Sequence, residues 1–259
     1  MKRARLPRGE AVKIPPPYSF LLWVALFFIG GALGSFLCLC VRRVPKGLSV
    51  ISPPSACETC LKPVKFYANI PVAGFFICRG ACLRCGARFS LFYPAVETLC
   101  AASAVAAVYV FGLSFEALRY FIFLYALIAA SAFDLSTMTV PDFITLPFAA
   151  AGILFSVPLG LFADAAVGGA LGGGILLVAA LIYKALKKKE GLGMGDVKLM
   201  AGVGTFVGAA DVPSVILVAS ITGAIGGVAY LKLYGRAVSQ IFPFAPFIAV
   251  SSFLFFFMG

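Results

Sequence analysis

Long apolar runs alternate along this chain with short segments that hold most of its charged residues. A run of about 18 to 22 apolar residues is long enough, as a helix, to cross a hydrocarbon core roughly 30 Å thick. Candidate spans lie at Ser19–Cys40, Phe92–Phe111, Ala117–Phe133, Phe143–Leu161, Ala165–Leu186, Val197–Ala210, Val212–Leu231 and Ile241–Met258. The pattern predicts an all-α polytopic membrane protein with about eight transmembrane helices.

One polar stretch is much longer than the others. Residues 42–90 hold eight basic residues, one acid and five of the eight cysteines, which predicts a small domain outside the membrane. The chain then divides into a basic leader at 1–18, a first transmembrane helix at 19–41, this loop domain at 42–90 and a transmembrane domain at 91–259. A cleaved signal peptide is the alternative for the first run, but its apolar length exceeds the usual 7 to 15 or so residues.

Composition supports a membrane protein. The hydrophobic fraction is 62% and the mean hydropathy is +1.04, against roughly 45 to 50% apolar residues in a soluble domain. The net charge of +11 comes from basic residues that flank apolar runs, as the positive-inside bias produces in cytoplasmic loops. We therefore expect the lipid bilayer as a partner, and no nucleic acid.

Alternating spans can be tested against this bias. If residues 42–90 are cytoplasmic, the same side receives the basic residues at 184, 187–189, 232 and 236. Arg119 and the five basic residues of the leader fall on the other side, against the bias. The remaining clusters agree, so we predict a cytoplasmic loop domain.

Four cysteines in the polar stretch form two C-x-x-C pairs. Cys57 and Cys60 make the first pair, and Cys82 and Cys85 the second. Two such pairs place four thiolates around a tetrahedral zinc ion in a closed structural site. Cys78 lies close enough in sequence to compete as a ligand. Disulfides or free thiols are the alternative, although a reducing cytoplasm disfavours the former.

Carboxylates are the candidates for hydrolytic chemistry. The chain contains no histidine, which excludes Ser-His and Cys-His pairs, the HExxH motif and His-ligated catalytic zinc. Asp134 ends the third span and Asp196 opens the sixth, so the predicted topology puts both at one membrane boundary. Two carboxylates held close share a proton and can serve as general acid and general base. Alternatively, Asp142 and Asp196 cap helices, and Glu97 has no partner that the sequence identifies.

Several longer motifs resemble one family over nearly the whole chain. They are Gly34-Ser35-Phe36-Leu37, Ser52-Pro53-Pro54-Ser55, Asn69-Ile70-Pro71, Arg79-Gly80-Ala81-Cys82, Tyr93-Pro94-Ala95-Val96-Glu97, Pro141-Asp142, Glu190-Gly191-Leu192-Gly193-Met194-Gly195-Asp196-Val197-Lys198-Leu199 and Pro243-Phe244-Ala245-Pro246-Phe247. The set is similar to the bacterial type IV prepilin peptidases, a branch of the GxGD intramembrane aspartyl proteases. Cys38, Ala68 and Ala245 stand where that pattern usually has asparagine, aspartate and glycine.

The resemblance implies an activity. It carries the catalytic pair onto Asp134 and Asp196, and the zinc ligands onto Cys57, Cys60, Cys82 and Cys85. It implies cleavage of prepilins or type II secretion pseudopilins after a glycine, on the cytoplasmic side of the bacterial inner membrane. It also implies methylation of the new amino terminus from S-adenosylmethionine, for which the motifs name no binding residues.

Two functions of other classes are weighed against this one. Intramembrane acids also bind cations in transporters, and a zinc knuckle can recruit a partner to a membrane scaffold. A transporter favours acids near the midplane and discontinuous helices in matched halves. The sequence has two acids at a boundary and no convincing internal repeat.

Overall fold

The computed structural model describes residues 18–57, 59–189, 191–234 and 242–258. Within these ranges lie nine α-helices and two short 3-10 helices. The helices are α1 (Tyr18–Arg43), α2 (Ala73–Ile77), α3 (Phe92–Phe111), α4 (Phe115–Thr137), α5 (Asp142–Ser156), α6 (Phe162–Lys187), α7 (Met194–Val207), α8 (Val212–Tyr234) and α9 (Ala245–Met258). Both 3-10 helices, η1 (Val44–Lys46) and η2 (Phe66–Asn69), lie between α1 and α2. The predicted leader lies outside the described residues except for Tyr18.

Five helices in the described ranges are long and apolar enough to cross a membrane: α1, α3, α4, α6 and α8. This makes the chain a multi-pass membrane protein. The helices α5, α7 and α9 have 15, 14 and 14 residues. Each was predicted as a span, and the count of eight transmembrane helices is not confirmed, because these three fall short of the length that a span needs.

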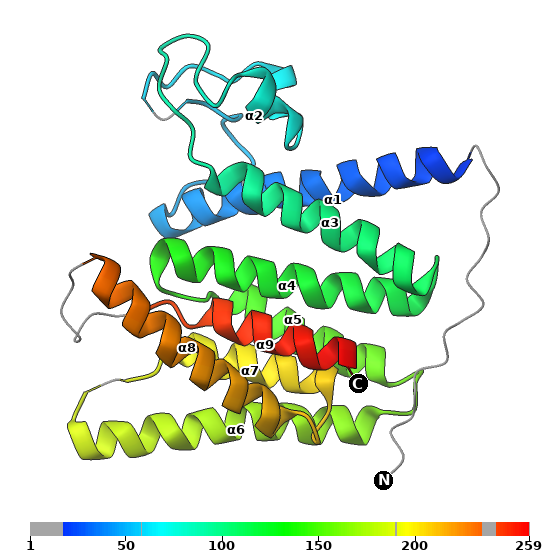
Figure 1. The fold of residues 1–259 in the computed structure, drawn as a ribbon, viewed down its shortest axis with the longest axis vertical. Helices are drawn as coiled ribbons and strands as arrows, with labels where there is room; N and C mark the ends of the chain where they lie inside the picture. Colours follow the sequence, from blue (N-terminus) through cyan, green and yellow to red (C-terminus); the bar gives the residue numbers. More distant parts are fainter. Residues whose placement is uncertain (1–17, 58, 190, 235–241, 259) are drawn as a thin grey trace. The chain divides into compact units, whose positions relative to one another are not determined.

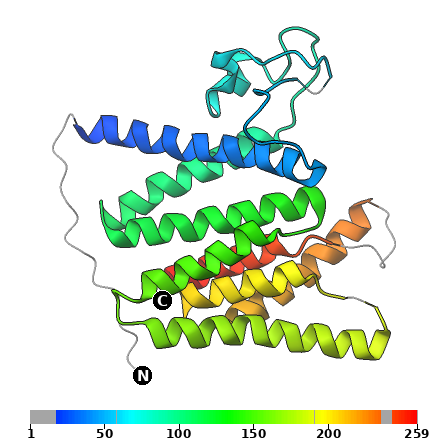
Figure 2. The same ribbon diagram turned by 180° about the vertical axis from the view of Figure 1, so that it is seen from behind.

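The described chain forms two compact units that divide within α4, one ending at Phe121 and the other beginning at Ile122. In the first unit, α1 and α3 pack closely through small residues. A methyl group added at Gly30 would lie 2.6 Å from the Cys100 carbonyl oxygen, and one at Gly34 would lie 2.8 Å from Cα of Glu97. The segment between these helices carries α2 and the four-cysteine loops (Figure 2).

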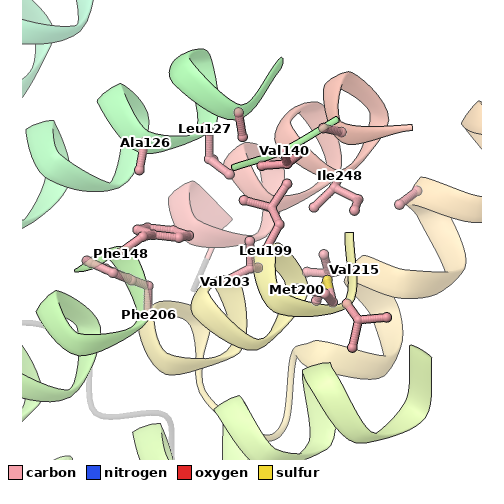
Figure 3. Close-up of a cluster of buried hydrophobic side chains, with 14 of the residues drawn as sticks. Ala126, Leu127, Val140, Phe148, Leu199, Met200, Val203, Phe206, Val215 and Ile248 are labelled. Carbon is pink, nitrogen blue, oxygen red and sulfur yellow. The ribbon is translucent and has the colours of Figure 1, made fainter. Parts of the chain in front are cut away.

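In the second unit, α7 is enclosed by α5, α6, α8 and α9 (Figure 1). Apolar side chains of α7, including Leu199, Met200 and Val203, are fully buried and point into the cluster drawn in Figure 3. Stacked aromatic rings extend this core, with ring centroids 4.9 Å apart for Phe148 and Phe206. The core fixes α7 against its neighbours.

Glycines bring α6 and α7 into backbone contact. A methyl group at Gly168 would overlap the Gly204 carbonyl oxygen, and one at Gly172 would overlap the Met200 carbonyl oxygen. Because residue numbers rise along one helix as they fall along the other, the two helices are antiparallel. The glycine-rich stretch at 168–174 therefore serves close helix packing in the membrane, as its composition suggests.

Candidate active site and four-cysteine cluster

Four helix ends meet at one end of the second unit. Helix α4 finishes there, and α5, α7 and α9 all begin there (Figure 1). A helix amino terminus carries unpaired N–H groups and a partial positive charge, so it favours a nearby carboxylate. Asp134 lies in the last turn of α4 and Asp196 in the first turn of α7. Three amino termini thus surround two acids.

Asp134 is held by the backbone. Its side chain is buried, and its Oδ2 accepts a hydrogen bond from the Ala245 N–H at 2.8 Å. Ala245 is the first residue of α9, and it is fully buried. The first residue of α9 therefore fixes the orientation of this carboxylate.

Asp196 is less completely bonded. Its Oδ1 is buried and has no hydrogen-bond partner among the residues that the structure describes. Gly195 beside it packs against Val140, where an added methyl group would come within 2.9 Å of the Val140 carbonyl oxygen. A side chain at Gly193 would lie 3.4 Å from the other carboxylate oxygen. The two glycines let α7 and Asp196 approach the α4–α5 connection closely.

The alternative that Asp142 and Asp196 cap helices is wrong. Gly193 is the N-cap of α7, Pro141 is the N-cap of α5, and neither helix has a side-chain cap hydrogen bond. Asp142 instead pairs with Lys198, whose Nζ lies 2.7 and 2.8 Å from the two carboxylate oxygens. This ion pair joins the first turn of α5 to the second turn of α7.

Asp134 and Asp196 are close enough to interact electrostatically. Two carboxylates held close together do not both ionise readily, so such a pair can share one proton. That state offers a base that can take a proton from water and an acid that can give one to a carbonyl oxygen. The arrangement is suited to hydrolysis without a covalent intermediate.

The four cysteines of the two C-x-x-C pairs converge in the first unit. Their Sγ atoms all lie within 4.8 Å of one another. The Cys57–Cys85 distance is 3.7 Å and the Cys60–Cys82 distance is 4.0 Å. Cys78 is buried outside this group, and none of the eight cysteines forms a disulfide. The cluster is compatible with a metal site.

The two loops of the cluster have the same backbone design. In the first, Leu61 N–H donates to the Cys57 carbonyl, and in the second, Gly86 N–H donates to the Cys82 carbonyl. Amides of Cys60 and Thr59 point at the Cys57 sulfur and lower its pKa to about 6. Amides of Arg84 and Cys85 lower the pKa of Cys82 in the same way. Amides that stabilise thiolates prepare the loops for a cation.

The pKa of Cys85 shifts in the opposite direction from those of Cys57 and Cys82. The Ala87 amide lowers its pKa, but desolvation and bonds to the neighbouring thiols outweigh that effect and raise the pKa to about 11. Four adjacent sulfurs cannot all carry a charge unless a cation lies between them. Full ionisation of the cluster therefore requires a metal.

Comparison with known proteins identifies the relationship. The Bacterial Peptidase A24 N-terminal domain matches residues 28–111, and the Type IV leader peptidase family matches residues 121–228. A prepilin leader peptidase/N-methyltransferase of Legionella pneumophila is 32% identical over 96% of this chain and 95% of its own length. The chain belongs to the type IV leader peptidase family.

Other relatives also match most of this chain. A prepilin leader peptidase/N-methyltransferase of Aeromonas salmonicida is 30% identical over 92% of this chain and 90% of its own length. One of Burkholderia pseudomallei is 35% identical over 83% of this chain and 71% of its own length. No solved structure matches the chain significantly.

The sequence predicts the acids and the cysteines as site residues, but it does not predict two backbone contacts. The sequence assigns no role to the motif at 243–247. In the structure, the Ala245 amide of this motif donates a hydrogen bond to Asp134. Glu97 had no partner, but its Oε2 accepts the Val72 N–H at 2.7 Å. Both are backbone donors, which no side-chain pattern reveals.

Proposed function

We propose that this protein is an intramembrane aspartyl endopeptidase that removes the leader of type IV prepilins or type II secretion pseudopilins after a glycine. We propose further that it methylates the new amino terminus, as the names of its relatives suggest. The meeting of Asp134 and Asp196 at the amino end of α7 carries the peptidase half. Cation transport is not favoured, because both acids lie in terminal helical turns.

The two aspartates take different roles in this proposal. The Ala245 N–H bond stabilises the charged form of Asp134, which suits it to remove a proton from the attacking water. The unpartnered oxygen of Asp196 is better protonated, and that proton can pass to the peptide carbonyl oxygen. The proton taken up by Asp134 then passes to the leaving nitrogen while Asp196 takes a proton from the resulting diol, and the C–N bond breaks to free the new amine. The pair titrates as a unit, so the roles can exchange during the cycle.

The four-cysteine cluster is proposed to hold structural zinc. With Zn–S bonds of 2.3 Å, a tetrahedral site has sulfur atoms about 3.8 Å apart, and the Cys57–Cys85 and Cys60–Cys82 distances are 3.7 and 4.0 Å. Four thiolates close the coordination sphere and leave no position for a reacting water. Zinc would thus fix the loop domain and take no part in hydrolysis.

Serine in place of Cys57 or Cys82 is expected to reduce bound zinc from about one ion per chain to a small fraction, since each variant loses one ligand. Metal content of the purified protein measures this directly. Serine in place of Cys78, a buried cysteine outside the cluster, should leave zinc unchanged. Equal zinc in all three variants would contradict the assignment.

We propose that the loop domain and the aspartates face the cytoplasm across the bacterial inner membrane. Helix α6 ends in Lys184 and Lys187 at the end of the unit where α7 begins, and lysines favour the cytoplasmic side. Arg119 is buried and lies 3.5 Å from Glu116. Its neutralised charge explains why an arginine on the other side is tolerated.

Mass spectrometry of a co-expressed prepilin tests both activities. The substrate should carry a basic leader, a glycine, a phenylalanine and an apolar helix. Loss of the leader with the added mass of one methyl group is the expected result. Loss of the leader alone would limit the function to cleavage. An intact prepilin beside folded, zinc-loaded protein would overturn the proposal.

A further inference from the structure

A cavity of about 140 Å³ lies in the first unit. Its walls come from the end of α1, the beginning of α3 and the segment that joins these two helices. It is open on one side, and its walls combine opposite charges with aromatic rings. The lining includes Arg42, Asn69, Phe75, Phe89, Tyr93 and Glu97. No part of this cavity belongs to the aspartate site, which lies in the other unit.

The one carboxylate in the wall is held firmly. Glu97 comes from the first turns of α3, and its Oε2 accepts the Val72 N–H at 2.7 Å. Val72 itself has φ of 61° and ψ of −56°, a positive-φ conformation that β-branched residues rarely adopt. Strained backbone of this kind is found at ligand sites, where the surrounding structure fixes it. The bond with Glu97 holds both groups beside the cavity.

The other cavities of this unit in the described residues have different chemistry. One of about 490 Å³, near Leu26 and Phe121, is lined by apolar residues except for Ser114. Another, beside the cysteine cluster, has only about 30 Å³. A ligand that is both charged and aromatic matches the cavity at Glu97 better than either of these.

We propose that this cavity binds the methyl donor S-adenosylmethionine. The cationic sulfonium and ammonium groups lie toward Glu97, the donor carboxylate lies toward Arg42, and the adenine packs on the aromatic rings. The cavity of about 140 Å³ is open on one side, so the part of the donor that it does not enclose extends outward there. The inference rests on the proposed methylation, and it names the residues that serve it.

The methyl transfer is a direct displacement of the donor sulfur by the pilin amine. The lone pair of the unprotonated pilin amine forms the new N–C bond, while the methyl–sulfur bonding pair stays on sulfur. S-adenosylhomocysteine leaves as a neutral thioether, and the amine loses one proton to solvent. Glu97 is a binding residue here, because its charge favours the cationic donor over this neutral product.

Binding of radiolabelled S-adenosylmethionine to the full-length zinc-loaded protein, with no prepilin present, tests the site. Saturable binding of one molecule per chain is expected. Glu97→Gln retains an acceptor for Val72 N–H but loses the charge, and should weaken binding by more than about tenfold. Phe75→Ala should weaken it by a similar factor, since one stacking surface is lost.

Each variant has a matched control. Phe76 is adjacent to Phe75 but 68% exposed, and it does not line the cavity, so Phe76→Ala should bind like the wild type. Glu116→Gln makes the same change as Glu97→Gln outside the cavity. Zinc content and prepilin cleavage report whether each variant is folded.

The outcomes separate this inference from the proposed function. If prepilin is cleaved and methylated but folded Glu97→Gln and Phe75→Ala bind the donor normally, the cavity assignment is overturned and the function stands. If the wild type neither binds the donor nor methylates a cleaved pilin, the methylation proposal itself fails. Weak binding confined to the two cavity variants supports the site.

Discussion

Asparagine in place of either Asp134 or Asp196 should slow leader cleavage by about 10²- to 10⁴-fold, the usual contribution of a positioned acid or base. Asparagine matches aspartate in size and can still accept the Ala245 N–H bond, but it cannot exchange a proton at neutral pH. Initial rates with purified protein and a prepilin measure the effect. Because the pair acts as a unit, the double variant should be little slower than either single one.

Asp164→Asn makes the same change away from the proposed site. Asp164 lies in the first turn of α6, and its Oδ1 accepts the Ala209 N–H at 3.1 Å, a bond that asparagine can keep. Since α6 and α7 are antiparallel, this acid lies at the far end of α7 from Asp196. The rate of leader cleavage by Asp164→Asn should differ from that of the wild type by no more than about twofold. Normal cleavage by both Asp134→Asn and Asp196→Asn would rule out the paired-carboxylate mechanism.

Valine at Gly172 should disrupt the packing of α6 against α7. An added methyl group would overlap the Met200 carbonyl oxygen, and backbone of α7 cannot give way without moving Asp196. Overpacking of this kind typically costs about 1 to 3 kcal/mol. We expect a lower thermal unfolding midpoint in detergent together with loss of prepilin cleavage.

Gly174→Val is the matched control, because Gly174 is on the same helix and has no heavy atom within 4 Å of an added methyl group. The two variants share any change in helix propensity, so their difference isolates the contact with α7. Similar unfolding midpoints for both variants would contradict close packing at Gly172.

The sequence predicted apolar helices better than it predicted their ends. The span at Phe92–Phe111 agrees with α3, but the one at Val197–Ala210 is displaced by three residues from α7 (Met194–Val207). Gly208, with φ of 83°, stops that helix before the apolar run ends. Hydropathy reports where residues tolerate lipid, whereas a helix end depends on local backbone conformation.

The sequence predicts the parts of the candidate site that consist of reactive side chains. Two acids at the ends of apolar runs and two C-x-x-C pairs can be recognised because the chain has few acids and no histidine, so few other residues could form such sites. The amide that orients Asp134 comes from Ala245, 111 residues away, and alanine has no polar side chain to draw attention. The cavity at Glu97 likewise forms only when a loop returns to α3. Such features arise from the tertiary fold.

Three short helices have a consequence for hydration. At 1.5 Å per residue, α5, α7 and α9 reach about 21 to 23 Å, which leaves roughly 7 to 9 Å of a 30 Å hydrocarbon core without helix. All three begin at the end where the aspartates lie, so headgroups and solvent can move inward there. A bilayer of shorter acyl chains matches these helices better, and it would bring bulk water closer to a bond that must be hydrolysed.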